Sequence, residues 1–188
     1  MNLLEEHVDV AVRVGELADS SLVARRVGEI RQVVCASPQY LTMRGKPQRL
    51  DQLRVHDCIS FGGLNSPDRW IFGREKSRAT VAVHSRLVVN TADAAISAAI
   101  AGSGVTRVFS YQVAEAIRHG ALEIVLSKFE PALVPVHLVY AGGRLPLKLR
   151  AFIDYTVPKL QELLSEALQP AQQRPVRRRR DRRLTLGH

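Results

Sequence analysis

Two places in the sequence combine the end of a predicted strand with the start of a predicted helix, an arrangement that can bind a small anion. Ser37-Pro38 and Asn90-Thr91 each follow a strand-like run and open a helix-like one. Unpaired backbone N–H groups at helix starts attract negative charge. With Arg13, at the end of another predicted strand, they could converge on a small carboxylate. The alternative interpretation is that Ser37, Asn90 and Thr91 only cap their helices.

The other reactive side chains form no recognisable catalytic or metal site. His56 and Cys58 make a His-x-Cys pair, but no second pair stands at a metal-binding spacing. The stretch that begins at Gly102 resembles part of a phosphate loop, yet it follows a helix, so it is interpreted as a helix stop. No Gly-x-Ser-x-Gly elbow is present. The sequence therefore predicts no enzyme, no cofactor and no metal.

The positive charge of the chain is concentrated at its C-terminal end. Residues 174–188 hold seven arginines and one aspartate, a net +6 out of a formal net charge of +9 for the whole chain. Such a segment buries too little apolar surface to order itself, so 169–188 is predicted to be disordered. It has no aromatic residues for stacking on bases. We expect at most weak, nonspecific attraction to DNA phosphates.

Composition also bears on the cellular compartment. No apolar run reaches the roughly 18 to 20 residues of a membrane span, and the N-terminal residues do not read as a signal peptide. Cys35 and Cys58 lie in strand-like apolar runs, which is typical of buried, reduced thiols. We therefore expect a cytoplasmic protein without membrane association.

Strand-like and helix-like segments alternate along the chain. Alternating valines over 8–14 predict a half-buried strand. A break at Gly28-Glu29 separates the next two predicted strands. The alternation predicts an α/β fold with mostly parallel sheets. The further predicted strands are 56–63, 69–72, 78–90, 105–109, 122–126 and 136–140, and the predicted helices begin at Pro38, 49, 91, 111 and 147, the last running to about 168 with Pro158 kinking or breaking it.

Several blocks of sequence, in order, resemble one protein family. They include "VDVAVRVG", "SSLVARR", "ASPQYL", "VHDCISF", "RLVVNTADAAISAAIAGSGV", "GALEIVLSKF" and "VHLVYAGGRLPLKLRAFIDY". These blocks closely resemble the effector-binding domain of LysR-type transcriptional regulators. The resemblance covers about residues 3–165.

The resemblance implies an α/β, periplasmic-binding-protein type II-like fold, with two α/β subdomains and a cleft that holds a small effector. The chain would cross between the subdomains twice. Residues 1–16 and 111–168 would form the first subdomain, and 17–110 the second. The cleft-facing positions of the family fall on Arg13, Gly15, Ser37, Phe61, Asn90, Thr91 and, at the second crossing, Val108 and Phe109.

The sequence departs from the family pattern at its N-terminal end. Family members begin with a winged helix-turn-helix domain and a linker helix, and neither has a counterpart in this sequence. The opening strand–helix–strand of the first subdomain also has none. We therefore expect an N-terminally truncated regulator whose first subdomain is incomplete. DNA recognition would reside in the missing domain.

The function expected from the resemblance is ligand sensing without catalysis, in a family that forms homo-oligomers. Arg13 and the helix starts favour a carboxylate effector. Three alternatives remain. One is a transport-type solute-binding protein of the same fold, against which the lack of an export signal argues. Another is an enzyme on this fold, such as a prephenate dehydratase or porphobilinogen deaminase relative. The third is a nucleic-acid-binding module that acts through the Arg-rich segment.

Overall fold

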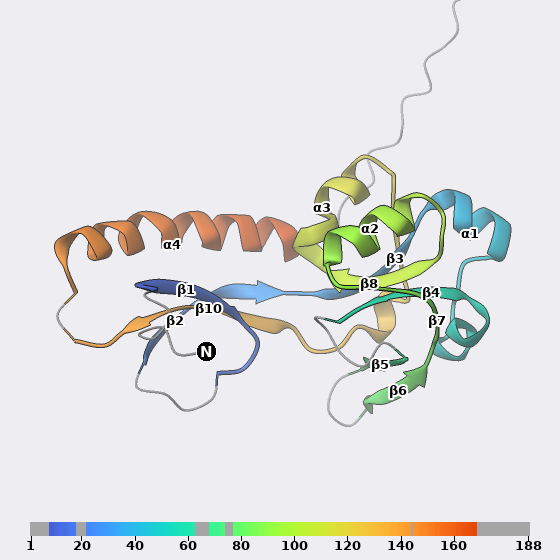
Figure 1. The fold of residues 1–188 in the computed structure, drawn as a ribbon, viewed down its shortest axis with the longest axis horizontal. Coiled ribbons are helices and arrows are strands. Elements are labelled where there is room, and N and C mark those ends of the chain that lie inside the picture. Colours follow the sequence, from blue (N-terminus) through green and yellow to red (C-terminus); the bar gives the residue numbers. More distant parts are fainter. Residues whose placement is uncertain (1–7, 18–21, 63–67, 74–76, 144, 169–188) are drawn as a thin grey trace, which may run out of the picture.

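Two β-sheets, between which the chain crosses twice, organise the protein in the computed structural model (Figure 1). The Arg-rich segment 169–188, predicted to be disordered, lies outside the described residues. The structure describes residues 8–17, 22–62, 68–73, 77–143 and 145–168.

The first sheet has the strand order β1-β10-β2, and both strand pairs run antiparallel. Helix α4 (Leu147–Leu168) lies over one face of this sheet (Figure 1). Its Ile153 and Val157 pack against buried side chains of β2 and β10. The strands are β1 (Val10–Val14), β2 (Leu22–Ile30) and β10 (Val134–Ala141).

The second sheet has the strand order β7-β4-β8-β3-β9. Strand β4 pairs in parallel with β7 and β8, whereas β3 pairs antiparallel with β8 and β9. Successive residues of β3 face opposite sides, so each face of the sheet carries its own apolar cluster. The strands are β3 (Gln32–Ala36), β4 (Asp57–Phe61), β7 (His84–Val89), β8 (Val105–Phe109) and β9 (Glu123–Val125).

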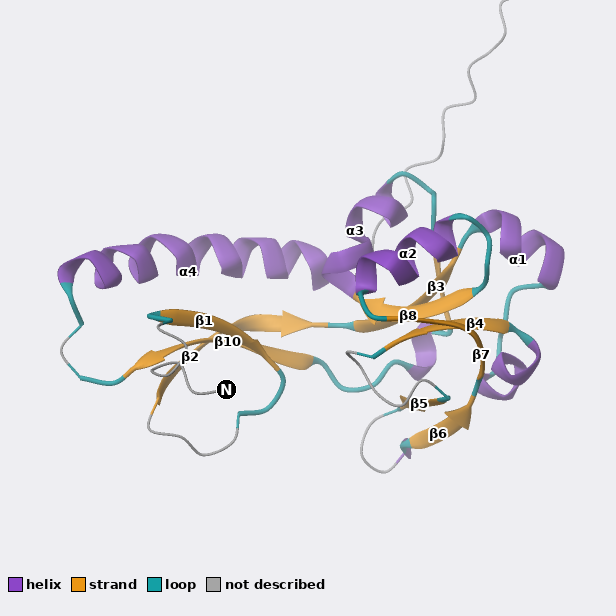
Figure 2. Ribbon diagram, viewed as in Figure 1, coloured by secondary structure: helices purple, strands orange, loops and turns teal. Residues whose placement is uncertain are grey.

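Different elements cover the two faces of the second sheet (Figure 2). Helices α2 (Ala92–Ile100) and α3 (Ser110–Arg118) pack on one face, over buried residues such as Val33 and Ile59. The other face is covered by the hairpin of β5 (Arg69–Phe72) and β6 (Ala79–Ala82). The apolar cluster beneath this hairpin also includes side chains of α1 (Pro38–Arg44) and of the 3₁₀ turns η1 (Leu50–Val55) and η3 (Ser127–Phe129).

Local sequence accounts for the helix starts. Ser37 Oγ accepts the N–H of Tyr40 at 3.3 Å, and Thr91 Oγ1 accepts the N–H of Ala94 at 3.2 Å. Ser37 and Thr91 therefore both cap their helices. Helix α4 continues through Pro158 without an interruption. No helix in the described part of the chain is long and apolar enough to cross a membrane.

The prediction of mostly parallel sheets is wrong, because the only parallel pairs among the described strands are those of β4 with β7 and with β8, and the other strand pairs run antiparallel. The extended chain runs on in one direction from β2 through Arg31 into β3. Strands that later return beside it, β10 in one sheet and β8 in the other, therefore run against it. The strand break predicted at Gly28-Glu29 is also wrong in position, since β2 continues through both residues to Ile30.

Gly28 is instead a position of close packing. The Leu164 side chain of α4 lies so near that a Cβ added to Gly28 would stand 2.9 Å from its Cδ1.

Sheet membership differs from the predicted subdomain segments. Strand β2 lies within 17–110 but pairs in the first sheet, and β9 lies within 111–168 but pairs in the second. The crossings fall at Arg31 and between Val125 and Val134, whereas the sequence places the second crossing at Val108-Phe109. On this basis we propose that β1, β2, β10 and α4 form one subdomain, and β3 to β9 with their helices the other.

A buried hydrogen-bond chain joins α1 to the start of β4. The N–H of Asp57 donates to Tyr40 Oη at 2.9 Å, and Tyr40 Oη lies 3.1 Å from His56 Nδ1. The Tyr40 hydroxyl can therefore donate a hydrogen bond to Nδ1 of a neutral His56. Burial, together with the nearby Arg44 guanidinium, lowers the pKa of His56. Cys58, the other half of the His-x-Cys pair, is buried with its thiol against the Leu53 carbonyl.

We expect acid to destabilise the protein through His56. Because the folded pKa of His56 lies below its ordinary value of about 6.5, the unfolded state takes up the proton first. The stability that His56 contributes is therefore present above about pH 6.5 and lost as the pH falls through the folded pKa. Urea unfolding of wild type and His56→Gln between about pH 7.5 and pH 5 checks this. Equal pH slopes for the two proteins would contradict it.

Gly104 is expected to tolerate no side chain. Its φ is +157°, and an added Cβ would stand 2.3 Å from the Asp57 carbonyl oxygen, which must then move. Gly104→Ala should lower the free energy of unfolding by about 1 to 3 kcal/mol. Gly62→Ala is the matched control, because an added Cβ there meets no atom within 4 Å. Urea unfolding measures both, and equal stability of the two variants would argue against the clash.

Candidate functional site

The two crossing segments are tied together by one ion pair. Arg31 Nε donates to Glu130 Oε2 at 2.8 Å, and Arg31 Nη2 donates to Glu130 Oε1 at 2.6 Å. The side chains are only 16% and 14% exposed. Such a bidentate pair fixes the guanidinium plane. The hydrogen bonds that Arg31 donates to Glu130 raise the pKa of Arg31, so it stays charged.

The start of α3 joins the same junction. The N–H of Ser110 donates to the Arg31 carbonyl at 2.8 Å, and the N–H of Arg31 lies 3.3 Å from Ser110 Oγ. The N–H of Phe109, one residue earlier, donates to Gln112 Oε1 at 2.9 Å. The first crossing, the end of β8 and the first turn of α3 are therefore held in fixed relation.

Several predicted site residues meet at one edge of the second sheet. Because β4, β7 and β8 run in parallel, their carboxyl ends lie together, with Phe61 beside Val89 in the register. Asn90 and Thr91 follow directly and are exposed, while Phe109 is half-buried. Phe109 also pairs with Gln32, the first residue after the crossing. This edge therefore faces the junction of the sheets.

Arg13 and Gly15 come to the junction from the first sheet. Gly15 follows β1, has a φ of +110°, and donates its N–H to the Pro135 carbonyl at 2.9 Å, next to the second crossing. Arg13 is half-buried and pairs with His137 in the register. Since side chains alternate along a strand, Arg13 points to the face opposite Val12 and Val14.

Two predicted site residues lie elsewhere. Ser37 follows the carboxyl end of β3. Because β3 runs antiparallel to β8, Ser37 lies at the opposite end of these strands from Phe109. Its Oγ lies 3.8 Å from the position of a Cβ added to Gly102 at the end of α2. Val108 is fully buried in the cluster beneath α2 and α3. The structure therefore places neither with Phe61, Asn90 and Thr91.

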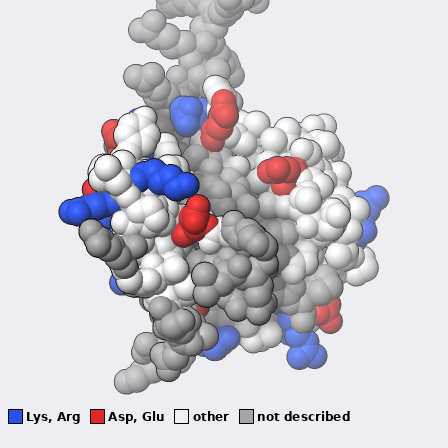
Figure 3. Space-filling view, turned by 60° about the vertical axis from the view of Figure 1, so that its left-hand side comes forward, with Lys and Arg blue, Asp and Glu red and all other residues white. Residues whose placement is uncertain are grey.

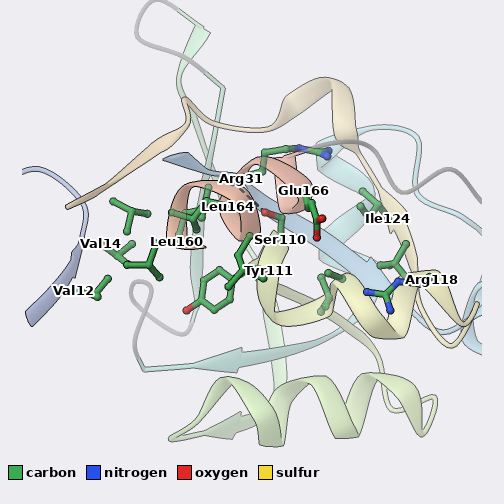
Figure 4. Close-up of a pocket in the computed structure, with 16 residues that line it drawn as sticks. Val12, Val14, Arg31, Ser110, Tyr111, Arg118, Ile124, Leu160, Leu164 and Glu166 are labelled. Carbon is green, nitrogen blue, oxygen red and sulfur yellow. Dashed lines mark hydrogen bonds between the residues drawn. The ribbon is translucent and has the colours of Figure 1, made fainter. Parts of the chain in front are cut away.

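A cavity of about 730 Å³ lies between the first sheet, α3 and α4 (Figure 4). Its walls are largely apolar and include Val12 and Val14 of β1 and Leu160, Leu163 and Leu164 of α4. The volume is in the range of small-molecule sites, roughly 300 to 1,000 Å³. Its polar lining residues are Arg31, Ser110, Tyr111, Arg118 and Glu166.

None of the eight predicted site residues lines this cavity. Sequence reasoning identified the neighbours of several lining residues instead, such as Arg13 between Val12 and Val14. Arg31 gave no usable signal, because its partner Glu130 is 99 residues away in the sequence. The only indication was a charged residue between two apolar strand-like runs.

Arg107 of β8 is a buried cation without an acidic partner among the described residues. Burial lowers its pKa to about 10. Its guanidinium lies over the rings of Trp70 and Phe72, 5.3 and 5.8 Å from their centroids, and Nη1 donates to the Ile71 carbonyl at 2.9 Å. These contacts attach the β5–β6 hairpin to the sheet, so Arg107 serves as a packing residue.

Charge and metal-ligating groups point to no other site in the described residues. On the face seen in Figure 3, Lys and Arg are interspersed with Asp and Glu rather than gathered in a patch. No three His, Cys, Asp or Glu residues cluster as a metal site in the part of the chain that the structure describes. Cys35 and Cys58 are both buried and unpaired, and burial raises the pKa of each thiol to about 12.

Comparison with known proteins identifies the family. Residues 1–161 match the family model described as the LysR substrate binding domain. The chain belongs to this family. An HTH-type transcriptional repressor of Pseudomonas aeruginosa is 34% identical over 165 residues, which cover 86% of this chain and 52% of that protein. The HTH-type transcriptional activator AaeR of Escherichia coli is 31% identical over 154 residues, covering 81% and 50%. This LysR-type chain thus spans about half the length of these curated relatives.

Solved structures agree with the family assignment. The regulatory domain of CrgA, a LysR-type transcriptional regulator from Neisseria meningitidis, superposes with a TM-score of 0.73 at 30% identity, covering 84% of this chain and 78% of that one. The regulatory domain of AphB from Vibrio vulnificus gives 0.71 at 28% identity, covering 82% and 76%. These likenesses confirm the predicted periplasmic-binding-protein type II-like α/β fold. They favour a regulatory domain over a transport protein.

In this LysR-type domain, replacing only one partner of the Arg31–Glu130 pair should lower the free energy of unfolding more than half as much as expected from replacing both. An unpaired charge that is mostly buried is more costly than no charge at all. Arg31→Met or Glu130→Met alone leaves a mostly buried charge without its partner and should lower the free energy of unfolding by about 2 kcal/mol. The double variant should lose clearly less than the sum, because no charge is left unpaired. A double-mutant cycle by urea unfolding measures the coupling. Additive single effects would contradict the pairing.

Proposed function

We propose that this domain binds a small-molecule effector in a cleft between its two subdomains, as part of a transcription regulator of the LysR type. The observation that carries the proposal is the meeting of several elements at the junction of the sheets. The carboxyl ends of β4, β7 and β8 face the first crossing, and the end of β1 adjoins the second. Ligands of open α/β sheets bind at such edges.

The proposed effector contacts are the predicted residues that adjoin this junction. They comprise a cation, a turn glycine, two half-buried aromatic residues and the exposed start of a helix. The helix start offers unpaired backbone N–H groups to an anionic group. The residues are Arg13, Gly15, Phe61, Asn90, Thr91 and Phe109.

The mechanism follows from the connections between the subdomains. Two single segments cross, so a change in their geometry alters how the sheets face each other. An effector shifts that arrangement only by as much as it binds one arrangement better than another. In a complete regulator, the shift would be passed to attached DNA-binding domains.

The remaining features of the proposal rest on the family. The relatives are named as transcriptional regulators, so we propose a regulatory role without catalysis, in the cytoplasm, with DNA and further copies of the protein as partners of the whole regulator. The effector is proposed to be a small molecule, with a carboxylate favoured by Arg13 and the start of α2.

Nuclear magnetic resonance can locate the effector. A thermal-shift screen of small metabolites supplies ligands, which are titrated into ¹⁵N-labelled protein. The expected result is that amide signals of Gly15, Phe61 and Thr91 move together, because these residues adjoin the junction. Ser37 is the internal control, since it stands at the opposite edge of the sheet. Shifts centred on Ser37, with the junction signals unchanged, would exclude the proposed cleft.

A further inference from the structure

The outer side of helix α4, which faces away from the first sheet, carries a stripe of exposed side chains. Its members follow one another at alternate spacings of four and three residues, so they lie along one side of the helix. Phe152 and Tyr155 in it are 53% and 66% exposed, although both are aromatic. In Figure 1, no other described element covers this side of α4 over most of its length. The outer stripe consists of Lys148, Phe152, Tyr155, Lys159, Glu162 and Glu166.

The charges of the outer stripe run against the dipole of their own helix. A helix favours acidic residues at its N-terminal end and basic residues at its C-terminal end. Lys148 lies in the first turn of α4 and Glu166 in the last, whereas α4 has no acidic residue in its first turn and no basic residue in its last. Within one chain this placement lowers the stability of the helix, so the helix by itself gives no reason for it.

The order of these residues is self-complementary for two antiparallel copies of the helix. With the two-fold axis level with Val157, Lys148 of each copy lies opposite Glu166 of the other, as in an isologous dimer. Tyr155 and Lys159 likewise lie opposite each other across the axis. Such a contact already occurs within one chain, where Lys159 Nζ lies 4.6 Å from the centroid of the Tyr155 ring. Each charge also comes to lie beside the favourable end of its neighbour's dipole.

Phe152 gives this pairing an apolar contact. In the same register it faces Glu162 of the other copy, whose methylene groups can lie along the ring while the carboxylate stays in water. Covering a half-exposed aromatic ring removes apolar surface from water and favours association. A single helix of 22 residues, about 33 Å long, buries less surface than a standard interface. The association should therefore be weak and reversible.

We propose that the outer stripe of α4 is a docking surface for a second copy of this chain, with the two helices antiparallel and Lys148 against Glu166. Charge complementarity selects this occupant, because an unrelated partner would not require basic and acidic residues to be placed symmetrically about Val157. The surface differs from the effector cleft, and the inference does not rest on the proposed function, since no residue of the outer stripe is among the effector contacts proposed above.

Charge reversal tests the pairing. Self-association of the full chain is measured by sedimentation velocity at low ionic strength, from low micromolar to several hundred micromolar concentration. Lys148→Glu and Glu166→Lys each place like charges opposite one another at two symmetric positions, so each should weaken the dimer about tenfold. Arg54→Glu and Glu16→Lys are the matched controls, because they make the same changes in net charge at exposed positions outside α4. They should leave the dissociation constant nearly unchanged.

Mixing the two charge-reversed proteins separates a direct contact from a general effect of charge. The heterodimer of Lys148→Glu with Glu166→Lys has unlike charges at both positions, so the mixture should regain the wild-type affinity although neither protein does so alone. The double variant Lys148→Glu/Glu166→Lys should self-associate like the wild type for the same reason. It should also unfold at a higher urea concentration, since both charges then agree with the helix dipole. Circular dichroism shows that each variant is folded.

Several results would overturn the proposal. One is a wild type that stays monomeric over the whole concentration range, and another is a loss of affinity no greater than in the controls. A third is a mixture that associates no better than its components. A dimer whose amide signals move with concentration at Val88, on the exposed edge strand β7, rather than at Tyr155 would also exclude it. Each leaves the effector cleft untouched, because that proposal depends on signals at the junction of the sheets during ligand titration.

Discussion

Glu130 and Arg31 hold together the two segments on which the relative placement of the sheets depends. Each crossing is a single segment of the chain, and the described strands form no hydrogen-bonded ladder from one sheet to the other. A bidentate pair that is mostly buried therefore supplies much of the lateral connection, and the hydrogen bonds between Arg31 and Ser110 extend it to α3. The end of β8, the start of α3 and both crossings take their positions from this junction.

Arg31, which is partly exposed, and Arg107, which is buried, are held by different contacts. Arg31, at the junction, is paired with the Glu130 carboxylate through Nε and Nη2. Arg107, in β8 of the second sheet, has no acidic partner among the described residues and lies over the rings of Trp70 and Phe72. A cation enclosed by rings serves packing.

Sequence patterns predicted the local elements well. The half-buried strand at β1, the caps at Ser37 and Thr91 and the extent of α4 follow from alternation, side-chain capping and helical spacing, all of which act within a few residues. The break assigned to Gly28 failed because a glycine can serve close packing as well as a turn, and the Leu164 side chain that packs on it lies far along the chain. The parallel sheets failed because strand direction depends on where the chain returns.

For the site, the sequence by itself determined the kinds of residue and, through the family resemblance, where most of the junction residues lie. Only the tertiary structure decided which of them meet. It separated Ser37 from Phe61, Asn90 and Phe109 because β3 runs against β8, and it joined Arg31 to Glu130 across 99 residues. The physical reason is one of range. Caps and alternation depend on neighbours along the chain, whereas strand partners, ion pairs and cavities depend on how distant segments pack.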